Sequence, residues 1–252
     1  MIKNLSKKYN DNGYLIVKNF LHNDKKFKYL SQQLNNDVHN KLSKININKY
    51  GGSLIGNLNV YPGIFGKKIF NVLKIKGLNK IVKECTGKEL NNFDISYGGN
   101  LNLPKKYNQH FHTDGKFEEK MIIISVATSD VNLNSGPTEI ILKSHKKKIT
   151  YLEFLISKKN KKKLTLSFGD LLIRQHYLWH RGTVNYSNKA RFQIAFMLFE
   201  RKRKIKQKIK LKKLYFFNNF FGNTFLSRLK EFIYVYLRPI YIIYKILNIK
   251  NY

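Results

Sequence analysis

Between residue 92 and about residue 200, the chain is a series of short apolar runs separated by turn residues, with no helical period between them. Turn segments such as "NLNSGP", "FGD" and "NYSNK" mark the breaks. The runs are "NFDISYG", "QHFHTD", "MIIISVATSDV", "TEIILK", "KLTLSF", "DLLIRQHYLWH" and "RFQIAFMLFE". Strands at this spacing without intervening helices indicate a sandwich or barrel. We therefore expect a mainly β domain over this part of the chain.

The first 90 residues have a different pattern, which predicts helices around a single strand. The segment "YLIVKNF" at 14–20 follows the turn signal "NDNG" and is predicted to be that strand. A helix should begin near Asn23 or Asp24, and a second one should cover 77–86 and end at Gly87. Residues 50–66 are glycine-rich and aperiodic, which predicts a long loop. The apolar face of the first helix comprises Phe27, Leu30, Leu34 and Val38; that of the second comprises Leu78, Ile81, Val82 and Cys85.

The overall charge of the chain predicts an anionic partner. The formal net charge is +33, from 48 basic and 15 acidic residues, which favours a membrane, a nucleic acid or an acidic metabolite as that partner. The single cysteine, Cys85, excludes an internal disulfide and fits a reducing compartment. The amino terminus lacks an apolar segment of signal-peptide length, so we expect a cytoplasmic protein.

After Glu200 the composition changes sharply, which predicts a boundary between a domain at 1–200 and a tail at 201–252. The segment "RKRKIKQKIKLKK" is nearly all basic, and "EFIYVYLRPIYIIYKIL" is aromatic and aliphatic but too short and interrupted to cross a bilayer. One interpretation is that the tail packs on the barrel. The other is a peripheral contact with the cytoplasmic face of an anionic membrane. Nucleic acid is less favoured, because lysine greatly outnumbers arginine and no DNA-reading element is present.

The stretch "YNQHFHTDGKFEEK" contains a candidate metal site. On a strand, the side chains of His112 and Asp114 would point to the same face, although such a pair is also an ordinary polar strand end. His180, at the end of a buried-looking strand, supplies a third candidate ligand, and Arg191 follows it by eleven positions (191 − 180) at the start of the next strand. Two histidines and one carboxylate suit non-haem Fe(II), and a buried arginine beside them suits the far carboxylate of 2-oxoglutarate.

At this point several motifs together resemble one family. "NDNGYLIVKNFL", "QHFHTDG", "VATSDVNLNSGPTEIILKSHK" and "GDLLIRQHYLWHRGTVNYSNKARFQIAF" resemble, in order, segments of phytanoyl-CoA dioxygenase-like proteins over residues 6–200. The resemblance implies a double-stranded β-helix (a cupin-like jelly roll) at 91–200, flanked by an N-terminal helical part at 1–90, with Fe(II) and O₂ and with 2-oxoglutarate as co-substrate. It implies His112, Asp114 and His180 as iron ligands and Arg191 as the 2-oxoglutarate anchor. Related halogenases replace the carboxylate, so retention of Asp114 favours a hydroxylase.

Two departures from the family pattern are visible. Lys143 stands where many relatives have a glycine before Ser-His, which predicts a differently shaped loop. Leu103 precedes Pro104 where many relatives have lysine, so we expect Asn102 to take over part of the binding of 2-oxoglutarate. Thr183 is a further candidate for holding its carboxylate.

The remaining histidines have competing interpretations. His110 shares a face with His112 by alternation, as a substrate contact or as a structural residue. His176 competes with His180 for the third ligand position, but the spacing to Arg191 favours His180, so we assign His176 a structural role. We expect His145 to bond to the backbone and Trp179 to lie in the core or the cavity wall.

The predicted function is an Fe(II)- and 2-oxoglutarate-dependent dioxygenase that hydroxylates a small-molecule or lipid-linked substrate. Residues 50–66 and 115–120 should border its pocket. The alternative is a non-catalytic β-barrel binding module that attaches to an anionic membrane or nucleic acid through its basic surface.

Overall fold

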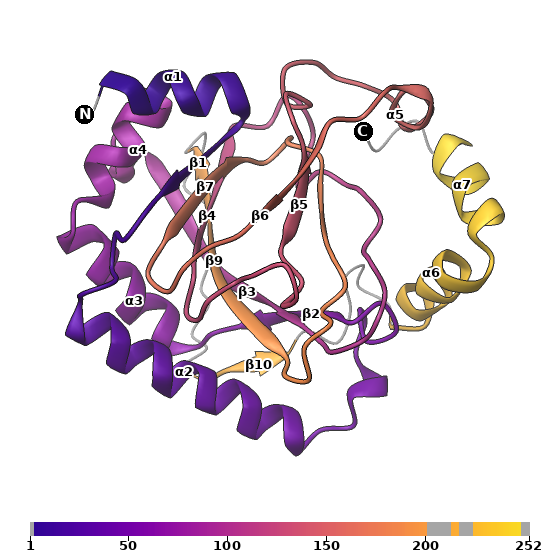
Figure 1. Ribbon diagram of the computed structural model, residues 1–252, viewed down its shortest axis with the longest axis horizontal. Coiled ribbons are helices and arrows are strands. Elements are labelled where there is room, and N and C mark those ends of the chain that lie inside the picture. The colour runs from indigo at the N-terminus through magenta and orange to yellow at the C-terminus, as the bar shows by residue number, and fades with distance from the viewer. Residues whose placement is uncertain (1–2, 201–212, 217–223, 248–252) are drawn as a thin grey trace.

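The computed structural model describes residues 3–200, 213–216 and 224–247 of the 252-residue chain (Figure 1). A seven-stranded antiparallel sheet forms its centre, in the order β1-β7-β4-β9-β3-β2-β10. Its strands are β1 (Tyr14–Val17), β2 (Asn57–Tyr61), β3 (Phe93–Asn102), β4 (Met121–Val126), β7 (Leu171–Gln175), β9 (Arg191–Glu200) and β10 (Tyr215–Phe216).

A smaller antiparallel sheet, in the order β6-β5-β8, packs over one end of the large sheet. Its strands are β5 (Thr138–Ile141), β6 (Lys161–Leu164) and β8 (His180–Gly182). Tyr14 and Leu172 of the large sheet share one hydrophobic cluster with Ile140 and Leu164 of the small sheet. The arrangement is the jelly roll implied by the resemblance, and that prediction is confirmed.

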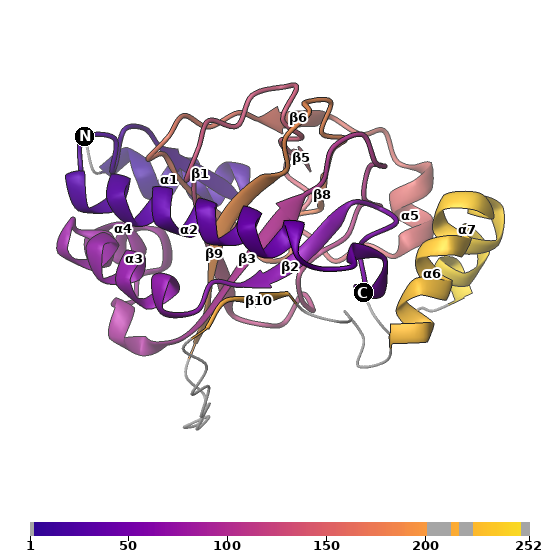
Figure 2. The same ribbon diagram turned by 90° about the horizontal axis from the view of Figure 1, so that it is seen from below.

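Four N-terminal helices cover the outer face of the large sheet (Figures 1 and 2). They are α1 (Lys3–Asn12), α2 (Lys25–Ser43), α3 (Ile64–Ile75) and α4 (Leu78–Thr86); single 3₁₀ turns, η1 (Ile47–Lys49) and η2 (Leu90–Asn92), follow α2 and α4. Asp24 caps α2 by accepting a hydrogen bond from the backbone N–H of Phe27, and Gly87 ends α4 in the left-handed conformation at φ 72°. The predicted apolar faces of α2 and α4 are buried.

The structure corrects the prediction for several segments. Residues 50–66 are not one long loop, because they contain β2 and the start of α3, and neither α1 nor α3 was predicted. The strand predicted at 14–20 ends at Val17, since Lys18 turns away to bond Asp170. "QHFHTD" forms only an isolated bridge at His112 instead of a regular strand.

The predicted strand "DLLIRQHYLWH" is also broken, and the break moves its end to another sheet. It stops at Gln175, turns, and resumes at His180 as β8 of the small sheet, whereas Arg191 starts β9 of the large sheet. The strand ends that carry His180 and Arg191 therefore belong to different sheets.

The C-terminal helices α6 (Thr224–Tyr236) and α7 (Arg238–Leu247) lie at one end of the barrel, beside the short helix α5 (Tyr151–Ile156) (Figures 1 and 2). Pro239 falls in the first turn of α7, where a missing N–H is tolerated. Glu231 of α6 accepts hydrogen bonds from the backbone N–H groups of Gly52 and Leu54, and Tyr234 donates to the Asn108 carbonyl at 2.8 Å. The described part of the tail thus packs on the barrel. The basic segment 201–212 lies outside the described residues. None of the described helices is long and apolar enough to cross a membrane.

Candidate metal centre and co-substrate pocket

Strand alternation places a set of polar side chains inside the barrel. On β9, Phe192, Ile194 and Phe196 pack in the main core beneath the helices, so Arg191 and Gln193 project from the opposite face. The same rule applies to three other strands whose apolar residues pack in that core. On these strands, the side chains of Asn57 (β2), Asn102 (β3) and Arg174 (β7) therefore point into the barrel.

Three potential metal ligands converge in this interior. One ligand atom each from His112, Asp114 and His180 lies within 4.8 Å of the others, and the described residues contain no other such group of His, Cys, Asp or Glu side chains. The backbones of His112 and His180 exchange two hydrogen bonds of 3.0 Å, which brings their ring centroids to 4.4 Å. The N–H of Asp114 donates to the His176 carbonyl at 2.9 Å. Backbone pairing therefore assembles the three ligands.

The two imidazoles are oriented in the same way. Nδ1 of His112 lies 2.9 Å from the His110 carbonyl, and Nδ1 of His180 lies 2.9 Å from the Leu178 carbonyl. A carbonyl can only accept, so the Nδ1 of His112 carries the proton and its Nε2 keeps its lone pair. A guanidinium nitrogen of Arg174, which can only donate, also lies 3.5 Å from Nδ1 of His180, but the shorter contact to the Leu178 carbonyl favours the same tautomer there. The Nε2 atom of His180 is 3.4 Å from Oδ2 of Asp114. Fixing the tautomer through the second nitrogen is the usual support of a metal-bound histidine.

Electrostatics keep this ligand set in its metal-binding protonation states. Burial lowers the pKa of His112, and burial together with Arg174 lowers the pKa of His180 well below its usual value, so both rings are neutral near pH 7. Burial alone would raise the pKa of Asp114. Arg174 and the two imidazoles outweigh it and hold that pKa well below its usual range. A neutral His pair with an ionised Asp is a donor set for Fe(II).

Arg174 is a site residue that the sequence reasoning missed. It forms an ion pair with Oδ2 of Asp114, and its side chain is 11% exposed. The signal was present, because an arginine interrupts the apolar run "DLLIRQ" at an inward position of β7. Arg174 orients the Asp114 carboxylate and keeps it charged.

Arg191 is a buried cation without a carboxylate partner in the described part of the chain. It is 6% exposed. Its Nε donates to the Ser135 carbonyl at 3.0 Å, one terminal nitrogen to the Gly136 carbonyl at 2.9 Å, and the other to Oε1 of Gln193 at 3.0 Å. A guanidinium has five N–H groups, so each terminal nitrogen keeps one to offer. Burial lowers the pKa of Arg191 only to about 10, so it stays charged and favours an anionic ligand.

Two buried side-chain amides in this interior have a nitrogen that makes no hydrogen bond among the described residues. Nε2 of Gln193 makes no hydrogen bond, and neither does the amide of Asn57, which lies against Gly182 of β8. Buried polar groups are rarely left unsatisfied. The free Gln193 donor beside the Arg191 guanidinium fits a carboxylate ligand such as 2-oxoglutarate, whereas Asn57 lies two strands from Arg191, because it pairs with Asn102 and Asn102 pairs with Arg191.

The other two predicted co-substrate residues bond to the protein itself. The Asn102 amide donates to the carbonyls of Gly136 (3.2 Å) and Thr183 (2.8 Å), and the Thr183 hydroxyl donates to the Pro137 carbonyl (2.7 Å). Asn102 is also the register partner of Arg191. The two side chains therefore hold in place the loop whose carbonyls position the Arg191 guanidinium.

The remaining histidines occupy distinct environments. Both ring nitrogens of His176 lie 2.8 Å from backbone carbonyls, those of Met121 and Lys116, so this ring has a structural role. His145 bonds the Asn10 carbonyl at 2.9 Å, as expected for a backbone contact. His110 lies 5.2 Å from the His112 ring between centroids and also contacts Tyr234 and Tyr241 of the tail.

Two other residues that the sequence analysis considered, Trp179 and Lys143, lie outside the candidate metal centre. Trp179 is fully buried. Lys143 adopts the left-handed conformation at φ 62° without being a glycine.

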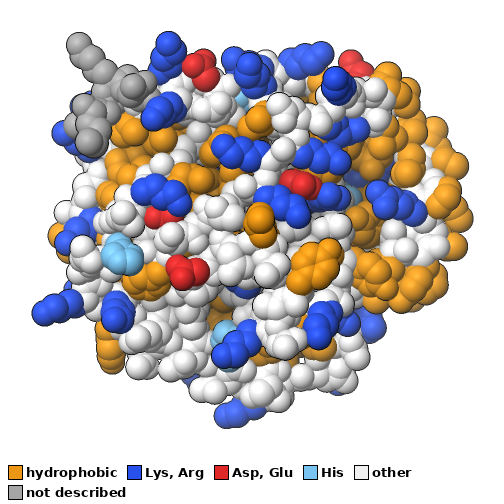
Figure 3. All heavy atoms as spheres, viewed as in Figure 1, with side chains coloured by type: hydrophobic (Ala, Val, Ile, Leu, Met, Phe, Trp, Pro, Cys, Tyr) orange, Lys and Arg blue, Asp and Glu red, His pale blue; other side chains and the backbone are white. Residues whose placement is uncertain are grey.

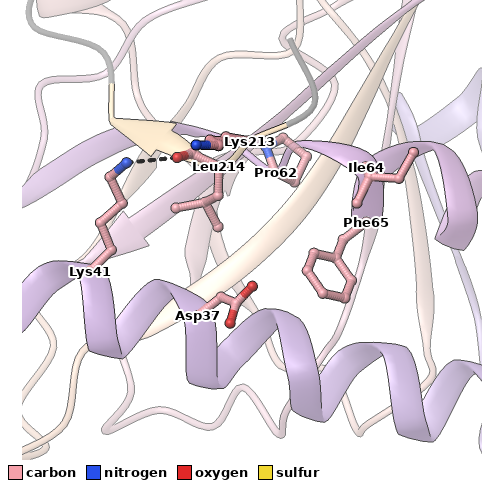
Figure 4. A pocket seen from close by; sticks show the side chains of 7 residues that line it. All are labelled: Asp37, Lys41, Pro62, Ile64, Phe65, Lys213 and Leu214. Carbon is pink, nitrogen blue, oxygen red and sulfur yellow. Dashed lines mark hydrogen bonds between the residues drawn. The ribbon is translucent and has the colours of Figure 1, made fainter.

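A cavity of about 330 Å³ lies away from the candidate metal centre, between α2, α3 and the start of β10 (Figure 4). Beside it, Lys41 donates to the Leu214 carbonyl at 2.7 Å. The candidate metal ligands do not line it.

Comparison with known proteins agrees with this geometry. Among solved structures, the chain is similar to the non-heme alpha ketoglutarate dependent carbocyclase SnoK from nogalamycin biosynthesis, at TM-score 0.61 and 14% identity over 79% of this chain and 83% of that one. The epimerase SnoN in complex with Fe3+, alpha ketoglutarate and nogalamycin RO gives TM-score 0.61 and 12% identity over the same shares. AviO1 from Streptomyces viridochromogenes Tue57 gives 0.62 and 10%, over 80% and 96%. These likenesses support the fold.

A search of curated proteins gave no match. The family model for phytanoyl-CoA dioxygenase matches residues 65–192, about half of the chain and including all three candidate metal ligands and Arg191. The chain therefore belongs to the phytanoyl-CoA dioxygenase (PhyH) family.

Proposed function

We propose that the protein is an Fe(II)- and 2-oxoglutarate-dependent dioxygenase that hydroxylates a small-molecule or lipid-linked substrate and releases succinate and CO₂. The observation that carries the proposal is the pairing, within one barrel, of a preassembled His-Asp-His group with a buried arginine that no carboxylate of the described residues pairs with. A binding module that does no chemistry would need neither.

Each side chain has a definite task in this proposal. His112, Asp114 and His180 would hold the iron, which when bound couples O₂ to the oxidative decarboxylation of 2-oxoglutarate. Arg191 would bind the far carboxylate of 2-oxoglutarate through its two remaining N–H groups, and Gln193 would be a further donor. Asn102 and Thr183 would support the loop that positions Arg191. Residues 1–200 would form the catalytic domain, with its helical part at 1–90 and its barrel at 91–200.

Hydroxylation is favoured over halogenation by the intact carboxylate at position 114. Asp114 would serve as the carboxylate ligand in place of a halide, and Arg174 keeps it ionised. The neighbouring carbocyclase and epimerase have the same fold but only 12–14% identity, so their named reactions do not carry over.

Succinate formation tests this proposal. Purified protein supplied with Fe(II), ascorbate and 2-oxoglutarate should release succinate, and His112→Ala or Asp114→Ala should abolish that release, while Arg191→Ala should mainly raise the 2-oxoglutarate requirement. His176→Ala is a useful comparison because it removes a buried imidazole outside the ligand set. Unchanged turnover in either ligand variant would refute the assignment.

The tail provides the basis for the second element of the proposal, peripheral contact with an anionic membrane. The outer faces of α6 and α7, together with Leu237 between the two helices, expose large apolar side chains, which gather at one end of the molecule (Figure 3). They are Phe225, Leu226, Leu229, Phe232, Tyr236, Leu237, Ile240, Ile243, Tyr244 and Leu247. A contiguous exposed apolar surface marks an interaction site, and the basic run before it fits anionic lipid, where each Lys or Arg contributes about 1 kcal/mol.

Vesicle binding tests the membrane contact. Full-length Phe232→Gln/Ile243→Gln protein should lose most of its sedimentation with anionic vesicles. The control is Ile75→Gln, because Ile75 is 78% exposed, more than Phe232 (48%) or Ile243 (57%), and lies on α3 at the other side of the molecule. Equal vesicle binding by the wild-type protein and the tail variant would contradict this contact.

A further inference from the structure

A second cavity of about 160 Å³ lies between the barrel and the helices at its end. Its walls come from α5, from α6 and α7, from β8 and from the segment before His112. His110 forms part of the wall, and its ring centroid is 5.2 Å from that of His112. His110 thus lines the cavity and is also a direct neighbour of one candidate metal ligand.

Four cations line this cavity with little compensation. They are Lys159, Lys161, Arg181 and Arg238. Arg181 pairs with Glu139 at 2.7 Å, whereas no carboxylate in the described ranges forms an ion pair with the other three. Burial and the neighbouring Lys161 lower the pKa of Lys159, which reflects this uncompensated charge. Lys159 and Arg181 are half-buried and Lys161 and Arg238 are exposed, so the four positive charges surround a site that an anion can reach from solvent.

Aromatic rings hold several of these charges in place. Arg181 and Lys161 both lie over the ring of Phe111, at 4.5 and 5.8 Å from its centroid. Lys159 lies 4.7 Å above Phe154 and donates to the Leu155 carbonyl at 3.1 Å. Cation–π contacts favour these positions of the charged side-chain ends before any ligand binds, so less side-chain entropy is lost on binding.

We propose that this cavity binds a phosphate or diphosphate group of the substrate and thereby orients the rest of the molecule past His110 toward the metal centre. This inference rests on the proposed function and names its substrate class. A phosphate monoester carries about −1.5 to −2 charges at pH 7, which matches several uncompensated cations better than one carboxylate does. The group would belong to a phosphorylated small molecule or to a lipid phosphate, whose chain the neighbouring apolar face of α6 and α7 would accept.

The single tryptophan supplies a direct readout. Trp179 stacks on Phe154, with ring centroids 4.2 Å apart and planes at 10°, and Phe154 lines the cavity. Inorganic diphosphate should therefore change Trp179 fluorescence in a saturable way in the full-length protein. Isothermal titration calorimetry of the same mixtures gives an independent dissociation constant.

A charge-matched pair of variants separates the cavity from the general basic surface. Lys161→Gln/Arg238→Gln should weaken diphosphate binding about tenfold or more, because two charge-assisted contacts are lost. Lys162→Gln/Arg228→Gln loses the same charge. Lys162 lies over Tyr14 and Arg228 is exposed on α6, so neither lines the cavity, and this control should stay within about twofold of wild type.

Vesicles of phosphatidylcholine with phosphatidic acid distinguish the two sources. If the cavity variant weakens both vesicle and diphosphate binding more than the control does, the group is a lipid phosphate; if it weakens diphosphate binding alone, the group is a soluble phosphate. Absence of saturable binding, or equal loss in the two double variants, would overturn the proposal. Neither assay contains iron or 2-oxoglutarate, so a failure here is separable from a failure of the oxygenase assignment.

Discussion

Replacing Arg191 by lysine separates its structural contacts from its proposed role in holding the co-substrate. Lysine keeps the charge, but its single ammonium can keep only one of the three contacts to Ser135, Gly136 and Gln193. Losing two charge-assisted bonds should lower the free energy of unfolding by about 3 kcal/mol. For a chain of this size, that corresponds to a fall of about 6–12 °C in the unfolding temperature.

Arg191→Lys should also weaken the binding of 2-oxoglutarate, by more than the loss of protein stability alone would explain. One arm of the bidentate grip is lost, so the dissociation constant should rise about 10- to 100-fold. Calorimetry with Mn(II) in place of Fe(II) measures it without turnover. Ser135→Ala is the control: it removes a hydroxyl that accepts from Asn132 in the same loop but leaves the guanidinium in place. If Arg191→Lys lowers the unfolding temperature yet binds 2-oxoglutarate as the Ser135→Ala protein does, Arg191 is only structural.

Two further predictions concern charged residues that the sequence reasoning did not single out. Arg174→Met removes the cation that lowers the pKa of Asp114, so this pKa should rise. Co(II) binding needs the ionised carboxylate and is therefore lost as pH falls. The pH at which half of the cobalt is released should be about 1–2 units higher in the variant than in the wild-type protein. A pH titration of the cobalt spectrum measures this, and an unshifted midpoint would contradict it. Glu231→Gln weakens the contacts to Gly52 and Leu54 by about 1–3 kcal/mol, so trypsin should cut after Lys230 faster, whereas the exposed Glu118→Gln should change nothing. Equal cutting rates for the two variants would show that Glu231 does not hold the tail.

The main architecture was predictable where the sequence carries a clear period. The apolar faces of α2 and α4 and the strands β3, β4 and β9 follow from spacing alone. Helices α1 and α3 were missed. In α1 the mean hydropathy is low, so no apolar stripe stands out, and α3 begins directly after a glycine-rich segment that suggested a loop. The turn at 176–179 was missed because the apolar residues Tyr177, Leu178 and Trp179 continue the apolar run of β7 through the chain reversal.

The site was predictable to the extent that its residues lie in recognisable motifs. His112, Asp114 and His180 were named from spacing and resemblance, and the structure brings them together, although His112 and Asp114 do not lie on the regular strand that we assumed. The polar residues around these ligands were harder to predict from the sequence. Arg174, Gln193 and Asn57 point inward through strand alternation, which a single sequence reveals only once the outward face is known. The contacts between the tail and His110 depend on tertiary packing alone.

Anaerobic titration of the apoprotein with Fe(II) and 2-oxoglutarate tests the central claim most directly, because a visible metal-to-ligand charge-transfer band requires both to bind at one centre. The wild-type protein should develop this band to one equivalent of iron, and His180→Ala should not, while His176→Ala should retain it. A band of full intensity in His180→Ala, or none in a folded wild-type protein, would contradict the assignment of His112, Asp114 and His180 as the iron site.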